Sequence, residues 1–446
     1  MTPIPRPSLV ISENRIRKEF DPQHIMDLVE SIKSKGLMHP IVVRYDPGTS
    51  SPILVAGENR LRAIETMWEL GYEVRCNGTV IPEQSIPTIS LGELSPTDAM
   101  EAELEENTRR RDLAWQEKAS AEAALHKLRS VQAEARGEVQ KVADTAKEIH
   151  GRADGAYQDS VRKNIILAEH LNRPEVAKAK TAQEAFKILK KQEQTERNAA
   201  LASAIGTTMR GSSHTLINTE CLAWLREQPP EQFDVILTDP PYGMDAQNFG
   251  DAGGKLSGTE HTYDDSLEYW NDLMHEWAKL AYAITKPQAH AYVFCDLDQF
   301  HALKSYMREA GWYVFRTPFI VHKLNSGRVP LPEYGPRRSW EMLLYAIKGS
   351  KPVTHIYPDV IACQGDDNPV HGAQKPVSLY HNLLMRSVRP GDKVLDTFAG
   401  AGPIIDAAHQ LKCYATAIEM NPALYGHCIK RVQAIDNQGD ILAGLN

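Results

Sequence analysis

Four consecutive residues, Asp239-Pro240-Pro241-Tyr242, place a carboxylate, a rigid backbone and an aromatic ring directly after the apolar run from Asp234 to Thr238. Proline fixes φ and has no N–H, so this segment presents hydrogen-bond acceptors in a stiff frame. The Asp239 carboxylate and the Pro240 carbonyl could accept both N–H bonds of an exocyclic base amino group, which favours a more nucleophilic nitrogen. Tyr242 would then stack on the extruded base. The plain alternative is a proline-rich turn after a buried strand.

A second candidate group surrounds two glycines late in the chain. Gly400 and Gly402 follow the expected strand that ends at Asp396, and they permit a tight turn in which backbone amides approach a ligand. Glu419 ends the next strand, about twenty residues on, at the offset where a carboxylate meets ribose hydroxyls. Position 405 is Ile405 instead of a third glycine, which disfavours a pyrophosphate cofactor and suits S-adenosylmethionine. The alternative is an ordinary β–α turn.

The elements that must position these residues begin near His214. From there, apolar strands alternate with helical stretches, a pattern typical of a parallel sheet with helices on its faces. We expect strands at 234–238, 291–294, 342–347, 393–396 and 414–418, and a helix at 404–410. Residues 214–446 are therefore predicted to form an α/β Rossmann-like domain, with both candidate groups at the carboxyl edge of its strands.

The preceding sequence has a different texture. Residues 1–95 mix short apolar runs with a helical pattern from His24 to Lys35, which predicts a small α+β domain. Residues 96–198 are rich in Ala, Glu, Lys, Gln and Arg at helical spacing and predict a helical region. Residues 199–213 are small and rich in Gly, Ser and Thr, so we interpret them as a linker.

Composition narrows the class of protein. A chain of 446 residues suffices for two or three domains, and its 42% hydrophobic content is that of a folded protein. It has no apolar run of membrane-spanning length and no signal-peptide stretch, so we expect a cytoplasmic protein that contacts no membrane. The six cysteines form no CxxC pair, and no metal site is predicted. The net charge of −8 requires that any nucleic-acid contact rely on local basic residues.

The ordered motifs resemble the β group of DNA amino-methyltransferases, which carry a D/N/S-P-P-Y/F/W motif ahead of the glycine loop. The strand around Glu341 and the segment His371-Gly372-Ala373-Gln374-Lys375-Pro376 also match that group, whereas Gly372 and Pro403 depart from its pattern. The resemblance implies S-adenosylmethionine as cofactor and adenine N6 as the favoured target, with cytosine N4 as the alternative. It places catalysis at Asp239, Pro240, Pro241 and Tyr242, and cofactor binding at Asp396, Phe398, Gly400, Gly402, Glu419, Asn421, Lys375 and Pro376.

The segment Gly57-Glu58-Asn59-Arg60-Leu61-Arg62-Ala63 and the later Glu106-Asn107-Thr108-Arg109-Arg110 resemble the two arginine motifs of the ParB amino-terminal domain. The resemblance implies a ParB/sulfiredoxin-like fold and CTP with Mg²⁺ as a second ligand, because arginines bind triphosphates through charge-assisted bonds. Asn59 departs from the family pattern, and a surface charge run is the alternative. The residues implied in nucleotide binding are Gly57, Glu58, Arg60, Arg62, Glu106, Asn107 and Arg110.

Two further sets of residues are candidates for contacts with double-stranded DNA. Helical patterns at 142–150 and 158–171 flank a turn at 151–155, the layout of a helix-turn-helix, although a plain helical bundle has the same signature. Basic loops in the α/β half could hold phosphates, or they are simply solvated surface. The candidates are Arg162, Lys163, Lys323, Arg328, Arg337 and Arg338.

Together these patterns predict an enzyme that methylates a base amino group in DNA and is brought to its sites by a ParB-like half. Such an enzyme fits a restriction-modification system or a phage or mobile element, and we also consider a homodimer. Two alternatives belong to other classes. One is a ParB-like, CTP-dependent regulator or partition factor with an accessory methyltransferase module. The other is an RNA methyltransferase, since the same catalytic chemistry serves RNA.

Overall fold

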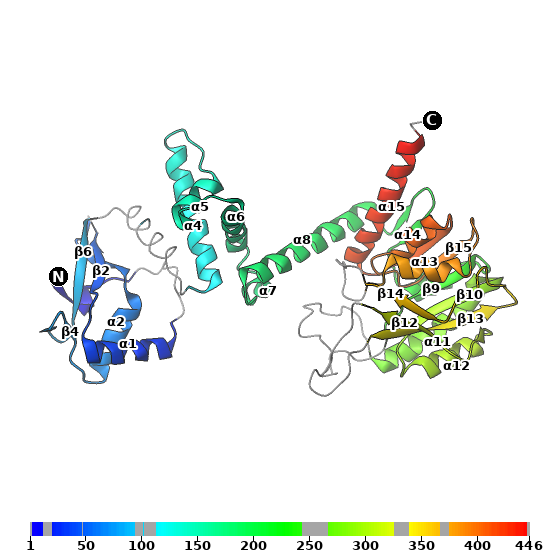
Figure 1. The fold of residues 1–446 in the computed structure, drawn as a ribbon, viewed down its shortest axis with the longest axis horizontal. Coiled ribbons are helices and arrows are strands. Elements are labelled where there is room, and N and C mark those ends of the chain that lie inside the picture. The colour runs from blue at the N-terminus through cyan, green and yellow to red at the C-terminus, as the bar shows by residue number, and fades with distance from the viewer. Residues whose placement is uncertain are drawn as a thin grey trace. The chain divides into compact units, whose positions relative to one another are not determined.

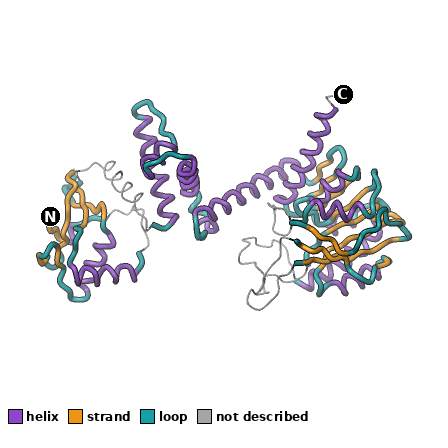
Figure 2. Tube along the Cα trace, in the orientation of Figure 1, coloured by secondary structure: helices purple, strands orange, loops and turns teal. Residues whose placement is uncertain are grey.

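The computed structural model describes residues 2–11, 20–46, 48–93, 101, 113–242, 266–324, 339–365 and 374–443 (Figures 1 and 2). The chain forms two compact units, Met1–Lys191 and Gln192–Asn446, which are taken separately below. No described helix is long and apolar enough to cross a membrane. Six residues singled out from the sequence lie outside the described ranges, namely Glu106, Asn107, Arg110, Arg328, Arg337 and Arg338.

The first unit begins with a four-stranded sheet of order β1-β6-β2-β3, in which β2 runs parallel to β6 and antiparallel to β3. The helices α1 and α2 bury Val29, Leu61, Ile64 and Met67 in the same core as Ile41 and Ile86 of the sheet. This arrangement confirms the α+β prediction. The elements are β1 (Thr2–Pro5), α1 (Pro22–Lys35), β2 (Ile41–Tyr45), β3 (Pro52–Ala56), α2 (Glu58–Glu69), β4 (Arg75–Cys76), β5 (Thr79–Val80) and β6 (Ser85–Glu93).

The rest of the first unit is helical. The helix α6 packs against both α4 and α5, and α5 ends at Gly151, which adopts a left-handed conformation with φ 70°. Asp154 caps α6 by accepting the backbone N–H bonds of Ala156 and Tyr157. The predicted helix pair is therefore present, while its contact with DNA stays a prediction. The helices are α4 (Trp115–Glu134), α5 (Val142–His150), α6 (Gly155–Glu169), α7 (Pro174–Ala177) and α8 (Ala182–Ile205).

Residues 199–213 do not form the linker that we expected. The helix α8 continues to Ile205, and β7 (Thr208–Arg210) pairs with β8 (Thr215–Ile217) at the edge of the large sheet. Small residues of this segment are packing positions: Ala202 is buried, and a Cβ at Gly211 would meet Val432 Cγ1 at 2.3 Å. Just before the segment, a Cβ at Gly426 would meet the Asn198 carbonyl oxygen at 2.3 Å. Small side chains let neighbouring segments approach closely. A sequence rich in small residues is equally typical of a flexible linker, so the sequence alone does not distinguish the two.

The second unit is built on a large mixed sheet whose main strand order is β14-β12-β13-β10-β9-β15-β16-β8-β7, with β11 paired to β13. Strands β8, β16, β15, β9 and β10 are parallel, and β13 is antiparallel to β10. The strands are β9 (Phe233–Thr238), β10 (Thr285–Cys295), β11 (Tyr313–Val314), β12 (Phe319–Lys323), β13 (Trp340–Lys348), β14 (Val360–Cys363), β15 (Lys393–Asp396) and β16 (Tyr414–Ile418).

Helices cover both faces of this sheet (Figure 1). Along β9, Val235 and Leu237 pack with α13, α14 and α15, whereas Ile236 packs with α9, α11 and α12. A strand buried on both faces reads as a continuous apolar run, as this one does. The predicted α/β Rossmann-like architecture is confirmed. The helices are α9 (Cys221–Arg226), α11 (Leu267–Ile284), α12 (Phe300–Glu309), α13 (Val377–Met385), α14 (Pro403–Gln410) and α15 (Pro422–Ala443).

Candidate active site

The two candidate groups lie at the same edge of the sheet because the strands that precede them are neighbours. β9 and β15 pair in parallel, with Ile236 opposite Leu395. The helix after β15, α14, packs on one face of the sheet, and the next described helix after β9, α11, packs on the other. Adjacent strands whose connections leave toward opposite faces create a switch point, where open α/β sheets bind ligands.

Thr238 connects the two groups. Its hydroxyl donates to Asp396 Oδ1 at 2.7 Å and lies 3.1 Å from the hydroxyl of Thr397, whose backbone N–H it accepts at 3.2 Å. From α11, Trp277 Nε1 donates to the same Thr397 hydroxyl at 3.0 Å. The sequence analysis did not single out Thr238. The available signal was a hydroxyl residue ending an otherwise aliphatic strand, immediately before Asp239.

Asp396 has one satisfied and one unsatisfied carboxyl oxygen. Oδ1 accepts the Thr238 hydroxyl and the Phe398 N–H, the latter at 3.1 Å. Oδ2 is buried and accepts no hydrogen bond of ordinary geometry from the described residues, and the nearby Tyr380 hydroxyl interacts with the Asp396 carboxylate. Burial raises the pKa of Asp396 to about 7. A buried carboxyl oxygen left without a donor suits a cationic ligand group, and the α-ammonium of S-adenosylmethionine is such a group.

Glu419 is held by the loop it faces. Its Oε2 accepts the Gly400 N–H at 2.7 Å, and its Oε1 accepts the Asn421 N–H at 2.8 Å. Burial raises the pKa of Glu419 to about 7, against the opposing effect of these amides. The Asn421 side chain, expected to contact cofactor, instead accepts the Ala423 N–H at 2.9 Å near the start of α15. Asn421 thus orients Glu419 through its main chain and stabilises the helix through its side chain.

The two glycines of the loop differ in their surroundings. Both have positive φ, 55° at Gly400 and 77° at Gly402. A Cβ at Gly402 would approach Cys428 Sγ and Ile405 Cδ1 to 2.8 Å, whereas a Cβ at Gly400 would meet nothing within 4 Å. Gly402 therefore allows close packing of the loop on its helices, and Gly400 leaves free space beside Glu419. The open space, the orphaned Asp396 oxygen and the Glu419 carboxylate fit a bound S-adenosylmethionine.

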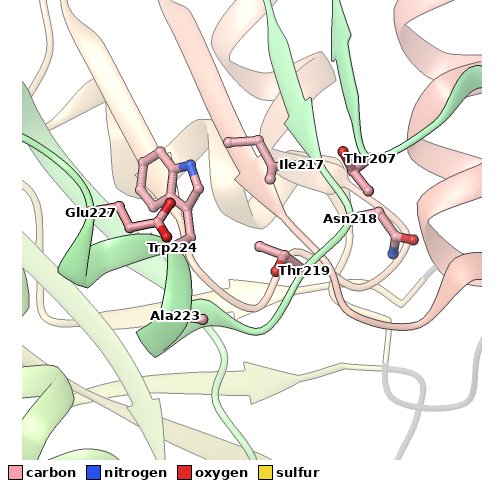
Figure 3. A pocket seen from close by; sticks show the side chains of 7 residues that line it. All are labelled: Thr207, Ile217, Asn218, Thr219, Ala223, Trp224 and Glu227. Carbon is pink, nitrogen blue, oxygen red and sulfur yellow. The ribbon is translucent and has the colours of Figure 1, made fainter.

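A cavity of about 250 Å³ lies beside the end of β8 (Figure 3). One of its lining residues, Asn218, donates to the Glu419 carbonyl at 2.8 Å, so the cavity adjoins the strand end that carries the Glu419 carboxylate. Its volume is just below the range of about 300–1,000 Å³ usual for ligand pockets, and none of the cofactor candidates named from the sequence lines it. The lining residues are Thr207, Ile217, Asn218, Thr219, Ala223, Trp224 and Glu227.

In the catalytic motif, the Asp239 carboxylate already has two donors. The Tyr242 hydroxyl donates to Oδ1 at 2.9 Å, and Lys375 Nζ donates to Oδ2 at 2.7 Å. Burial raises the pKa of Asp239, and the Lys375 ammonium opposes that rise. Tyr242, expected only to stack on a base, also orients the carboxylate through its hydroxyl.

Lys375 and Lys323 have partners that the sequence analysis did not anticipate. Lys375, expected in the cofactor pocket, pairs with Asp239 and lies 3.4 Å from Glu341 Oε2. Lys323, expected at DNA phosphates, pairs with Glu341 Oε1. β12 and β13 are neighbours in the sheet, with Val321 opposite Glu341, and that pairing places the Lys323 and Glu341 side chains within contact. Pro376 precedes the first residue of α13.

In the first unit, the two described motif arginines are engaged within the domain. Arg60 donates to the carbonyls of His39 and Pro40 at 2.7 and 2.8 Å. Arg62 pairs with Glu58 at 2.9 Å, and its guanidinium lies 3.8 Å from the centre of the Phe20 ring. These contacts hold the domain together, and CTP binding stays a prediction.

The helix pair α5–α6 places its two basic candidates differently. Arg162 is exposed, whereas Lys163 pairs with Asp159 at 2.6 Å along α6. A salt bridge one turn apart on an exposed helix contributes about 0.3–0.5 kcal/mol, so Lys163 remains available at little cost. Among the residues with described positions, no group of three His, Cys, Asp or Glu side chains is arranged to hold a metal ion.

The fold and the edge-of-sheet site define a Rossmann-like α/β protein with a nucleoside-type cofactor site beside an acidic proline motif. Residues 233–361 and 350–429 match the family model of DNA methylases. Residues 2–93 match the model of the ParB N-terminal domain. The chain therefore joins a ParB N-terminal domain to a DNA methylase domain, as the motifs predicted.

Individual curated proteins and solved structures are similar to about half of this chain. The type II methyltransferase M2.DpnII of Streptococcus pneumoniae is 24% identical over 212 residues, covering 42% of this chain and 77% of the relative. The type II methyltransferase M.HinfI of Haemophilus influenzae is 25% identical over 260 residues, covering 51% and 71%. Two solved structures also match. The M1.HpyAVI–SAM complex has a TM-score of 0.39 and 19% identity, covering 49% of this chain and 98% of that one. The cytosine-N4-specific PvuII DNA methyltransferase has a TM-score of 0.40 and 15% identity, covering 51% of this chain and 93% of that one.

Proposed function

We propose that this protein transfers a methyl group from S-adenosylmethionine to an exocyclic amino group of a base in DNA, with adenine N6 as the preferred target. The observation that supports this most is the junction at Thr238. It joins the Asp239 motif directly to Asp396, so an acceptor for an amino group lies next to the residues suited to the cofactor. Adenine is preferred over cytosine N4 because the first motif position is Asp239, the residue that accompanies adenine in the family that the motif resembles.

In this proposal each polar residue of the site has a defined task. When bound, S-adenosylmethionine supplies a methyl group on a positively charged sulfur. The free oxygen of Asp396 would accept the α-ammonium group, and Glu419 would accept the ribose hydroxyls. Asp239 and the Pro240 carbonyl would accept the two N–H bonds of the target amine, and an Asp239 oxygen could take the proton that the nitrogen loses.

The direct test incubates the full chain with S-adenosylmethionine carrying a labelled methyl group and with DNA of mixed sequence, then identifies the labelled nucleoside. We expect N6-methyladenine, and labelled cytosine would instead assign the enzyme to the N4 class. The Asp239→Ala variant should lose about 10²–10³-fold in rate, because it lacks a group that stabilises charge in the transition state. A parallel incubation with RNA tests the RNA alternative, which labelled RNA together with unlabelled DNA would favour.

We further propose that the ParB N-terminal domain and the α5–α6 helix pair direct the enzyme to its sites. Exposed Arg162 would contact DNA from α6, as residues of a recognition helix do. The test compares the full chain with residues 192–446 on the same DNA, since the second unit begins at Gln192 and α8 carries the Asn198 contact with α15. The shorter chain should keep S-adenosylmethionine binding and lose site preference; an identical pattern of methylated sites would contradict the proposal.

A homodimer is also part of this proposal, because type II sites are often symmetric and a two-fold protein matches them. Light scattering of the full chain at several concentrations, with and without DNA, measures its mass. The dimer proposal predicts a mass near twice 49.9 kDa. A constant monomeric mass in both conditions would exclude it.

A further inference from the structure

Lys375, the charged partner of Asp239, is more buried than Asp239 itself. Its side chain is only 8% exposed, against 18% for Asp239. An ammonium group is strongly hydrated, so burying it is unfavourable unless an anion lies close by. Asp239 Oδ2 at 2.7 Å supplies that anion. Lys375 Nζ also lies 4.9 Å from the centre of the Phe294 ring, a favourable distance for a cation over an aromatic face.

A second carboxylate stands behind this ion pair. Glu341 Oε2 is 3.4 Å from Lys375 Nζ and accepts no hydrogen bond of ordinary geometry from the described residues. Glu341 Oε1 pairs with Lys323. The four side chains thus alternate in charge: Asp239, Lys375, Glu341 and Lys323. They come from the end of β9, the segment before α13, and the neighbouring strands β13 and β12. Lys375 therefore lies between two carboxylates, whereas Asp239 is held by one ammonium group and by the Tyr242 hydroxyl.

The other groups around Asp239 do not replace Lys375. Among the residues that the structure describes, the titratable side chains that act on Asp239 or feel its charge are Lys375, Tyr242, Glu341, Tyr380, Cys295 and Asp396. Of these six, Lys375 alone carries a positive charge. Burial and the Glu341 carboxylate raise the pKa of Asp239, and Lys375 provides the largest opposing effect, followed by the Tyr242 hydroxyl.

We propose that Lys375 is a positioning residue that keeps Asp239 in its carboxylate form and orients it toward the target amino group, with Glu341 and Lys323 fixing the lysine. This rests on the proposed function of Asp239. A protonated carboxyl would present an O–H donor where an acceptor is needed. An ionised carboxylate has about four lone-pair positions, of which Tyr242 and Lys375 use two, so the amine can bind without displacing the lysine.

The experiment measures kcat for DNA methylation from pH 6 to 10 in Lys375→Met, Lys375→Arg and Glu341→Gln. Lys375→Met lacks the ammonium group, so the acidic limb of its pH–kcat profile should move to higher pH. At pH values below the displaced limb, kcat should fall about tenfold for each pH unit of displacement, and it should recover at alkaline pH. Lys375→Arg should retain a limb near the wild-type position. Glu341→Gln should move the limb the opposite way, because it removes a negative charge that disfavours ionised Asp239.

The matched control is Lys348→Met. Lys348 is 9% exposed, as buried as Lys375, and donates to the carbonyls of Tyr282 and Thr285, away from Asp239. Its loss should leave the limb in place. A wild-type profile in Lys375→Met, with a raised KM for S-adenosylmethionine, would overturn the proposal and return Lys375 to the cofactor pocket.

A second readout does not depend on activity. Difference infrared spectra, with Asp239→Asn to identify its carboxyl band, give the titration midpoint of Asp239 directly. That midpoint should rise in Lys375→Met and fall in Glu341→Gln, and an unchanged midpoint in both variants refutes the proposal. If the midpoints move as expected but the wild-type protein methylates no nucleic acid, the proposed function fails and the assignment of Lys375 stands.

Discussion

The glycine loop of the methylase domain and the arginine motif of the ParB domain use the same backbone device with different outcomes. Each follows a strand and opens a helix at a left-handed glycine, Gly402 before α14 and Gly57 before α2. In the methylase loop, no described residue donates a hydrogen bond of ordinary geometry to Asp396 Oδ2, and a Cβ at Gly400 would meet none of the described atoms within 4 Å. In the ParB motif, the Arg60 guanidinium fills the space beside the glycine, 2.9 Å from where a Gly57 Cβ would lie. One loop keeps polar groups for a ligand, and the other uses them for its own fold.

The two helix-opening glycines give the largest expected effect on stability. Gly402→Ala forces a left-handed alanine, costing about 1–2 kcal/mol, and drives its Cβ against buried Cys428 and Ile405, costing about 1–3 kcal/mol more. Gly57→Ala meets only the end of a flexible arginine, so it should cost about 1–2 kcal/mol. Calorimetry of the full chain, with the two transitions assigned from residues 192–446 alone, measures both. Equal losses would show that the packing around Gly402 relaxes.

Asp396 gives the next effect, on cofactor affinity. Its pKa and that of Glu419 are both about 7 in the free protein, and a cationic cofactor favours the ionised forms. Affinity for S-adenosylmethionine should therefore rise between pH 6 and 8, by up to about tenfold per unit for each proton released. Asp396→Asn should weaken binding and leave only the smaller dependence due to Glu419. Titration calorimetry in buffers of different ionisation heat counts the protons, and an unchanged count in Asp396→Asn would contradict this role.

The same two carboxyls make a prediction about the free domain. A carboxyl whose pKa is higher in the folded state binds more protons there than in the unfolded state, so folding is favoured at lower pH. Stability should therefore decline as pH rises from the ordinary carboxyl range, about 4, through about 7. Saturating S-adenosylmethionine should reduce that decline. Thermal unfolding of residues 192–446 at pH 5 and pH 8, with and without cofactor, tests both statements.

Much of the fold and of the candidate site could be predicted from the sequence, because the motifs indicate which strands carry the functional residues. The apolar run ending at Thr238, the loop with Gly400 and Gly402, and the carboxylate Glu419 all lie where their spacing indicated. The partners of Lys323 and Lys375 could not be predicted, since they depend on which segments become neighbours in the fold: Lys323 and Glu341 are 18 residues apart, and Lys375 and Asp239 are 136 apart. The extent of α8 was also hidden, because a stretch of alanines fits a helix interface or a linker equally well.

The two ParB arginines differ in their expected effects, and the difference tests whether this motif serves the fold or a nucleotide. Arg60→Ala leaves the Pro40 carbonyl, a partly buried acceptor, without its donor and should destabilise the first unit by about 1–3 kcal/mol. Arg62→Ala removes an exposed pair one helical turn apart and should cost about 0.5 kcal/mol or less. Thermal unfolding with and without CTP and Mg²⁺ measures both. If CTP stabilises the wild-type unit and neither variant, the arginines bind nucleotide by releasing their present partners; if CTP has no effect on any of the three, Arg60 serves the domain's own backbone.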